Sequence, residues 1–157
     1  MFNDGLAELI NRGGIYRDVQ GSNPREVLST LIGVLPPVPS FSADELLEAV
    51  LEREALMSTG IGGGIALPHP RNPLACSDSE QFAVLAFLKE AVDWHSLDGE
   101  KVDTLLLVVS ASAKQHLQTL SEITFFCRHE NFYHLLKERA SLDKLLSFIR
   151  EAEKNWN

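Results

Sequence analysis

The sequence predicts an α/β fold in which a buried central sheet is covered by helices on both faces. Two apolar runs, residues 82–88 and 104–109, contain β-branched and aromatic residues and lack the polar alternation of a half-exposed strand. Helical patterns behind capping residues occur both before and after these runs, so helices and strands are interleaved. The chain has 157 residues, the size of one domain, and we expect residues 1–157 to form a single domain.

The first part of the chain predicts three helices and one strand. Residues 5–11 predict a short amphipathic helix that ends at the two following glycines, and residues 15–19 predict a strand. The next helix begins at Asn23, because Asn is a good N-cap and Pro24 fits the first helical position. A capping box at residues 42–45 opens a third helix, which is expected to run to about Arg53.

The middle of the chain is glycine-rich and then polar. Residues 59–64 contain too many glycines for a helix and predict a turn with positive φ values, whereas residues 65–67 predict a short strand. The turn-forming residues 71–80 predict a surface loop before the first buried strand.

The last part of the chain predicts three further helices. Ser112 and Gln115 form a capping-box pattern at the start of the first of them. Its inward residues are expected to be Leu117, Leu120, Ile123 and Phe126. A short helix is predicted at residues 131–137, and the final helix begins at Ser141.

Composition excludes several functional classes. The formal net charge is −8, which disfavours a nucleic-acid-binding protein, because such proteins need a basic surface to displace counterions. The apolar runs are too short to span a bilayer, and the first residues lack the pattern of a signal peptide. The two cysteines form no CxxC motif, so no metal site is expected. We therefore expect a cytoplasmic protein that is not inserted in a membrane.

His69 is the strongest candidate for chemistry. It follows the glycine-rich turn and the short predicted strand, and it lies between Pro68 and Pro70, which restrict the backbone on both sides. From this pattern alone, a reactive histidine at the rim of a sheet and an ordinary turn histidine are equally supported. His95, His129 and His134 are interpreted as surface or cap residues.

Two further residues are weaker candidates. His116 lies in the first turn of a predicted helix, where unpaired N–H groups favour a bound anion. Arg53 ends a predicted helix, where an arginine is most often a solvated charge but can also hold a phosphate with its planar fork. The glycine-rich stretch matches neither the dinucleotide fingerprint nor a Walker loop, because position 65 is Ile and no Lys-Ser/Thr follows. Cys76 lacks a cationic environment beyond Arg71, and Cys127 is interpreted as a core residue.

Three stretches of the sequence resemble one known family. Residues 51–69, with Arg53, the Gly60-x-Gly62 pair and Ala66-Leu67-Pro68-His69, resemble the signature of the IIA domain of the bacterial phosphoenolpyruvate:sugar phosphotransferase system. Residues 93–103 and 114–123 are similar to the same family. The match is to its mannitol/fructose class (type 2), which includes the nitrogen-regulatory IIA proteins.

The resemblance implies a mixed sheet flanked by helices and a phosphotransferase activity without cofactor or metal. His69 is implied as the phospho-acceptor, forming tele-phosphohistidine, with His116 and Arg53 as the other active-site residues. The expected partners are an HPr-type phosphocarrier and either a IIB component or regulatory protein targets. Together with the resemblance, the residue types needed to stabilise a phosphoryl group point to Arg53, His116 and Thr59.

The sequence alone leaves alternatives to this interpretation open. The family usually has a small residue, often Gly, where this chain has Pro70, and proline removes an N–H that could contact phosphate. A binding or sensor module that has kept the fold and lost phosphoryl transfer is therefore a second hypothesis, and a metal hydrolase using His69, Cys76 and His116 is a third. Sugar transport and nitrogen regulation are both compatible with the motifs.

Overall fold

A computed structural model describes residues 5–155. One helix, one strand and two helices come first along the chain, followed by four strands and then three helices, with a short 3₁₀ turn at Asp78–Glu80 before the last two strands. The helices are α1 (Leu6–Gly13), α2 (Pro24–Gly33), α3 (Ala43–Leu56), α4 (Ala113–Arg128), α5 (Glu130–Lys137) and α6 (Leu142–Lys154). The strands are β1 (Ile15–Val19), β2 (Gly60–Gly62), β3 (Ile65–Ala66), β4 (Phe82–Val92) and β5 (Val102–Val109).

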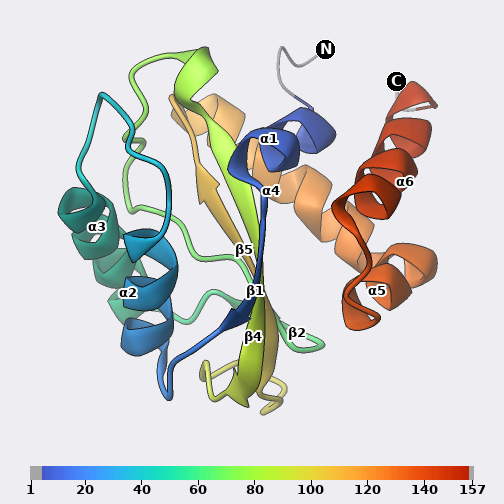
Figure 1. Cartoon of the computed structure of the whole chain (residues 1–157), viewed down its shortest axis with the longest axis horizontal. Coiled ribbons are helices and arrows are strands. Elements are labelled where there is room, and N and C mark those ends of the chain that lie inside the picture. The colour runs from blue at the N-terminus through green and yellow to red at the C-terminus, as the bar shows by residue number, and fades with distance from the viewer. Residues whose placement is uncertain (1–4, 156–157) are drawn as a thin grey trace.

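The five strands form one mixed sheet in the order β1-β4-β5-β3-β2. β1 pairs parallel with β4 and β3 pairs parallel with β5, whereas β4 with β5 and β2 with β3 are antiparallel. Figure 1 shows the sheet nearly edge-on, with α2 and α3 on one side and α1, α4, α5 and α6 on the other. The predicted α/β class, the mixed sheet and the helices on both faces are confirmed.

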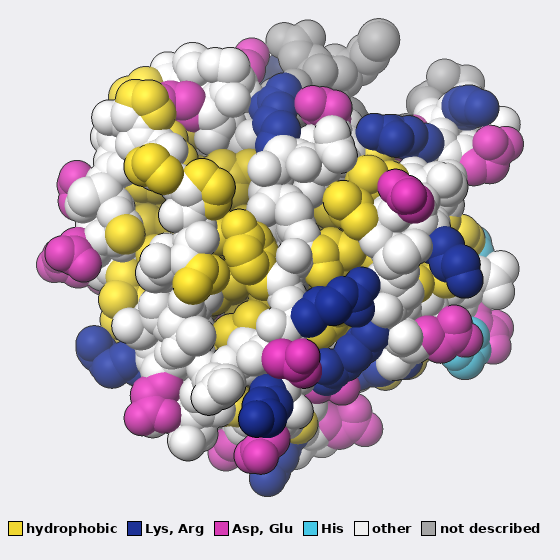
Figure 2. All heavy atoms as spheres, in the orientation of Figure 1, with side chains coloured by type: hydrophobic (Ala, Val, Ile, Leu, Met, Phe, Trp, Pro, Cys, Tyr) yellow, Lys and Arg dark blue, Asp and Glu magenta, His cyan; other side chains and the backbone are white. Residues whose placement is uncertain are grey.

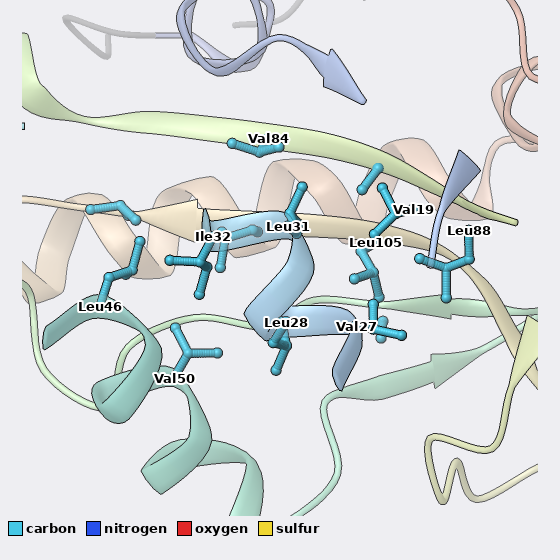
Figure 3. Close-up of a cluster of buried hydrophobic side chains, with 14 of the residues drawn as sticks. Val19, Val27, Leu28, Leu31, Ile32, Leu46, Val50, Val84, Leu88 and Leu105 are labelled. Atoms are coloured by element: carbon cyan, nitrogen blue, oxygen red, sulfur yellow. The ribbon is translucent and has the colours of Figure 1, made fainter. Parts of the chain in front are cut away.

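The continuous apolar run of β4 follows from this layering. Val84, Ala86 and Leu88 belong to the core beneath α2 and α3, part of which is shown in Figure 3. Ala83, Leu85 and Phe87, which alternate with them, belong to the core under the four other helices. Side chains of a strand point to opposite faces in turn, so a strand covered on both faces needs apolar residues at every position.

The predicted helix starts are present, but some helix boundaries and the direction of one side chain differ from the prediction. Ser42 and Glu45 form the complete capping box, and α3 continues to Leu56 instead of ending near Arg53. At the start of α4, Ser112 caps as predicted, while the Gln115 side-chain amide donates to Thr119. Leu117 was expected to point inward and is 66% exposed, because it lies on the outer face of α4.

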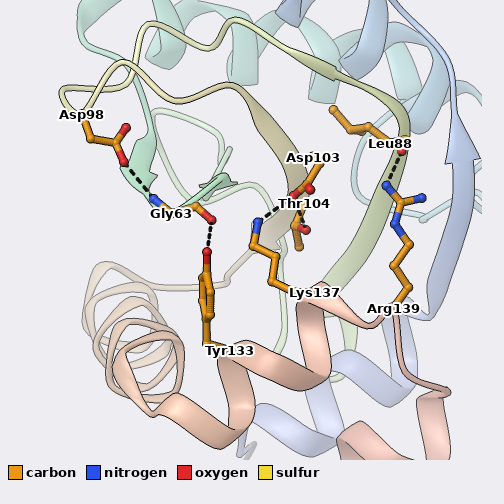
Figure 4. A network of polar contacts seen from close by, with 8 residues as sticks. All are labelled: Gly63, Leu88, Asp98, Asp103, Thr104, Tyr133, Lys137 and Arg139. Atoms are coloured by element: carbon orange, nitrogen blue, oxygen red, sulfur yellow. Dashed lines mark hydrogen bonds and ion pairs between the residues drawn. The ribbon is translucent and has the colours of Figure 1, made fainter.

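The glycine-rich stretch forms a hairpin, of which strand β2 was not predicted. Gly62, Gly63 and Gly64 have φ values of 91°, 66° and 82°, the positive values expected for this turn. As Figure 4 shows, the Gly63 carbonyl accepts from the Tyr133 hydroxyl of α5 at 2.8 Å, and its N–H donates to Asp98 at 2.9 Å. The turn is therefore held from two sides.

The outer surface carries charges of both signs. Figure 2 shows acidic and basic side chains mixed over one face, with hydrophobic side chains exposed between them. Within residues 5–155, no helix combines the length and the apolar character needed to cross a membrane.

Two carboxyl groups meet at the start of α1, which begins after Gly5 without a side-chain cap. Glu122 of α4 accepts from the Leu6 N–H at 3.4 Å, and Glu153 of α6 accepts from the same region and forms a hydrogen bond with Glu122. Burial, together with the nearby Glu153 charge, raises the pKa of Glu122 to about 7. Burial also raises the pKa of Glu153, although hydrogen bonds from the Leu6 and Ala7 N–H groups and the Arg150 charge oppose this.

This carboxyl pair predicts a stability that decreases as pH rises. Between the ordinary Glu pKa and about 7, the folded state binds a proton that the unfolded chain releases, so the free energy of unfolding falls with increasing pH. We expect Glu122→Gln to be more stable than the wild type by about 1–3 kcal/mol at pH 8, with little difference at pH 4.5. Urea denaturation at both pH values measures this, with the exposed Glu151→Gln as control. An equal difference at both pH values would contradict the assignment.

Candidate functional site

The backbone of β3 and β5 places His69 and His116 at the same edge of the sheet. β3 runs parallel to β5, and the pairing continues beyond β3 because the Pro68 carbonyl accepts from the Val108 N–H at 3.1 Å. His69 follows directly. β5 ends at Val109, and α4 then begins with its first turn at the same end. The carboxyl ends of neighbouring parallel strands therefore bring the two histidines together, a common position for ligand sites in α/β folds.

The His69 ring is held by one backbone hydrogen bond. Its Nδ1 lies 2.8 Å from the Leu67 carbonyl oxygen. Because a carbonyl can only accept, Nδ1 carries the proton and Nε2 has a free lone pair. The side chain is only 8% exposed. Nε2 of His69 has no hydrogen-bond partner within residues 5–155. In that part of the chain, Ser96 Oγ is the only fully buried side-chain polar atom without a partner. Nε2 is therefore not fully buried and remains in contact with solvent.

The His116 ring lies against the His69 ring. The two ring centroids are 4.6 Å apart, with an angle of 49° between the ring planes. The Ser112 side chain caps the helix at the Gln115 N–H, and the His116 N–H donates to the Ser112 carbonyl. His116 is half-buried. The start of α4 therefore places a second imidazole beside the His69 ring.

Arg53 completes this group from the last turn of α3. One terminal nitrogen of its guanidinium donates to the Met57 carbonyl at 2.8 Å, just after the helix ends. Its charge contributes to the shifted pKa values of both histidines, which places it near both rings. Apart from the bond to Met57, the N–H groups of Arg53 have no acceptor within residues 5–155.

Both histidines of this group are neutral at pH 7. Burial lowers the pKa of His69 below its ordinary value, and the Arg53 charge acts in the same direction, while the Leu67 hydrogen bond and the Glu54 charge oppose them. Burial, His69 and Arg53 together lower the pKa of His116 to about 4. A neutral imidazole is the nucleophilic form, and His69 holds this form at neutral pH.

Thr59 is buried, and its side chain is hydrogen-bonded to other protein groups. Its hydroxyl donates to Glu54 at 2.6 Å and accepts from the Trp94 indole N–H at 3.3 Å. Its prediction as a phosphate-binding residue stays a prediction, because a contact with phosphate would have to compete with these bonds. Sequence reasoning did not assign roles to Glu54 and Trp94, although both lie in the stretches that carried the family resemblance.

The remaining candidates lie apart from this site. Cys76 is exposed in the loop before β4. Across residues 5–155, no three His, Cys, Asp or Glu side chains come together as a metal ligand set, so His69, Cys76 and His116 do not form one. His95, His129 and His134 are exposed, as predicted. Cys127 is half-buried against the core, and burial raises its pKa to about 12.

Comparison with known proteins identifies the family. Residues 8–152 match the family model described as phosphoenolpyruvate-dependent sugar phosphotransferase system, EIIA 2. The chain belongs to this EIIA 2 family. It is 31% identical over 151 residues to a nitrogen regulatory protein of Pseudomonas aeruginosa, covering 94% of this chain and 96% of the relative. It is 26% identical to the fructose-specific EIIABC component of Bacillus subtilis, covering 95% of this chain and 24% of that protein.

Solved structures show the same fold. The nitrogen regulatory protein IIA-Ntr of Neisseria meningitidis superposes with a TM-score of 0.78 at 22% identity, covering 91% of this chain and 97% of that one. The IIA mannitol protein of Escherichia coli, solved in complex with phosphorylated enzyme IIB, gives a TM-score of 0.63 at 18% identity, covering 87% and 94%. The predicted resemblance is therefore confirmed, and the chain is a IIA-type component with a phosphotransfer role.

Proposed function

We propose that His69 accepts a phosphoryl group on Nε2 from an HPr-type phosphocarrier and carries it as tele-phosphohistidine. The observation that carries the proposal is the hydrogen bond from Nδ1 of His69 to the Leu67 carbonyl, which leaves the Nε2 lone pair free in a site shared with His116 and Arg53. In the transfer, this lone pair forms the new N–P bond as the P–N bond of the donor phosphohistidine breaks, with its electron pair returning to the donor ring.

The neighbouring groups suit the charges that change during the transfer. The phosphoryl group passes through a loose transition state with charge spread over its oxygens, so positioned positive charge and N–H donors stabilise it. Arg53 supplies a permanent charge, and neutral His116 supplies one ring N–H without repelling His69. When Nε2 is phosphorylated, the ring becomes more positive, and the Leu67 carbonyl stabilises it through Nδ1–H.

The onward role that we favour is regulatory. The match to a nitrogen regulatory protein over 96% of that relative's length supports phosphorylation-dependent contacts with regulatory targets. Transfer to a IIB component of a fructose or mannitol transporter is the alternative, supported by the match to the fructose-specific component. A phosphorylation-incompetent binding module with the same fold is the other alternative, and Pro70, which offers no N–H beside His69, is the feature that favours it.

Phosphoryl uptake tests the proposal directly. We expect the purified chain to gain one phosphoryl group when incubated with phosphoenolpyruvate, enzyme I and an HPr-type carrier, in a bond that is labile in acid and stable in base. Mass spectrometry of the intact chain measures the stoichiometry. Carriers of the sugar and nitrogen branches are compared at equal concentration, and faster uptake from the nitrogen-branch carrier supports regulation. No uptake from either carrier would overturn the proposal and favour the binding module.

A further inference from the structure

Glu54 follows Arg53 directly on α3, and its carboxylate binds Thr59. One of its carboxylate oxygens accepts from the Thr59 N–H at 2.8 Å, and the other accepts from the Thr59 hydroxyl at 2.6 Å. Both carboxylate oxygens of Glu54 therefore bind Thr59. These bonds link the two ends of the short loop between α3 and β2. No hydrogen bond joins Glu54 to the His69 ring, since only its charge acts there.

Thr59 connects this carboxylate to the backbone before His69. Its carbonyl accepts from the Leu67 N–H at 3.0 Å. The Leu67 carbonyl, at the other end of the same residue, accepts from Nδ1 of His69 at 2.8 Å. Thr59 itself is only 6% exposed, and the Trp94 indole fixes its hydroxyl from the other side. An unbroken series of hydrogen bonds thus runs from Glu54 through Thr59 and Leu67 to the ring.

We propose that Glu54 is a positioning residue, which acts through Thr59 and Leu67 to keep His69 in the Nδ1–H tautomer with Nε2 directed at the phosphoryl donor. Its effect on transfer rests on the proposed function, whereas its effect on the tautomer belongs to the free protein. Charge-assisted hydrogen bonds are about twice as strong as neutral ones, so a carboxylate is suited to holding a loop that must place an atom accurately. Misplacement by about 1 Å can cost 10²-fold in rate.

The charge of Glu54 gives the proposal a second observable consequence. Glu54 raises the pKa of His69, while Arg53 and burial lower it. The charges of the adjacent residues 53 and 54 thus shift the pKa of His69 in opposite directions. Removing the Glu54 charge is expected to lower the pKa of His69 further. Losing the bonds to Thr59 is expected to leave the His69 ring without a fixed orientation and tautomer.

The experiment compares Glu54→Ala and Glu54→Gln with Glu52→Gln. Glu52 is exposed on the same helix and pairs with Arg71 at 3.2 Å, so it is a matched control. The first measurement is the ¹⁵N chemical shifts of the His69 ring across a pH titration of the unphosphorylated protein. The second is the rate of phosphoryl uptake from an HPr-type carrier.

For Glu54→Ala we expect averaged ring shifts typical of two tautomers and uptake about 10- to 100-fold slower. For Glu54→Gln, whose amide oxygen still accepts from Thr59, we expect a lower His69 pKa and uptake less than 10-fold slower. Glu52→Gln is expected to match the wild type. If the alanine variant does not fold, the glutamine variant decides, and an unchanged His69 pKa with an unchanged rate overturns the proposal.

The two proposals can fail separately. A wild-type chain that takes up no phosphoryl group, while Glu54→Ala still changes the tautomer, rejects the proposed function and leaves the positioning role supported. A wild-type chain that is phosphorylated normally, with a Glu54→Ala variant that keeps both its tautomer and its rate, rejects the positioning role alone.

Discussion

Replacing His69 with alanine is expected to abolish stable phosphorylation of the chain. No other side chain in the site combines a free ring nitrogen with the fixed tautomer that the Leu67 carbonyl imposes. His116 is the neighbouring imidazole, but burial and the Arg53 charge still lower its pKa in this variant, which makes it a weaker nucleophile. The measurement is intact mass after incubation with the complete phosphoryl donor system, and loss of more than 10³-fold in uptake is expected.

Exposed histidines provide the controls for this result. His134, on α5, is 64% exposed at its side chain and contacts Glu130 of the same helix. His134→Ala is expected to be phosphorylated like the wild type. Circular dichroism checks that His69→Ala retains the fold. Full labelling of His69→Ala, or labelling that peptide mapping assigns to His116, would show that the acceptor has been misassigned.

The Gly13→Ala substitution is expected to destabilise the fold by about 2–4 kcal/mol. Gly13 ends α1 where the helix crosses β4, and an added Cβ would lie 2.0 Å from the Ala83 carbonyl oxygen and 2.5 Å from its carbon. Both atoms belong to the backbone of a central strand, which cannot rotate aside as a side chain can. The helix must therefore move away from the sheet and lose part of its buried contact.

A second helix-terminal glycine provides the matched control. Gly33 ends α2, and an added Cβ there would have no neighbour within 4 Å. Gly33→Ala is expected to leave stability unchanged or to raise it by up to about 1 kcal/mol, because alanine reduces the freedom of the unfolded chain. Chemical denaturation of both variants measures the contrast. Equal midpoints for the two would contradict the close approach of α1 to β4.

Local sequence signals predicted the elements whose causes are local. Asn23 and Ser42 satisfy N–H groups three residues away, and the apolar run of β4 reflects burial on both faces, so each could be inferred from neighbouring residues. Strand β2 was missed because two of its three residues, Gly60 and Gly62, have a low strand propensity, and its pairing depends on tertiary contacts. The outward Leu117 was missed for a similar reason, since an apolar side chain at helical spacing does not reveal which face the sheet covers.

The candidate site was inferred in part. The pattern around His69 indicated a restricted backbone, and the family resemblance joined it with His116 and Arg53. Nothing local could show that the two rings lie in contact, because their meeting depends on the parallel pairing of β3 with β5. The roles of Glu54 and Trp94 were hidden for the same reason, since both act through Thr59, which contacts them only in the folded chain.

The dependence of the site on this strand pairing has a practical consequence. Arg53, His69 and His116 belong to three separate segments that meet only when β3 has docked beside β5. A partly folded chain, even one rich in helix, would lack this assembled group of three side chains, which we propose as the acceptor site. The fraction of a sample that becomes labelled should therefore count its correctly folded molecules, which offers a simple quality assay for preparations and for destabilised variants.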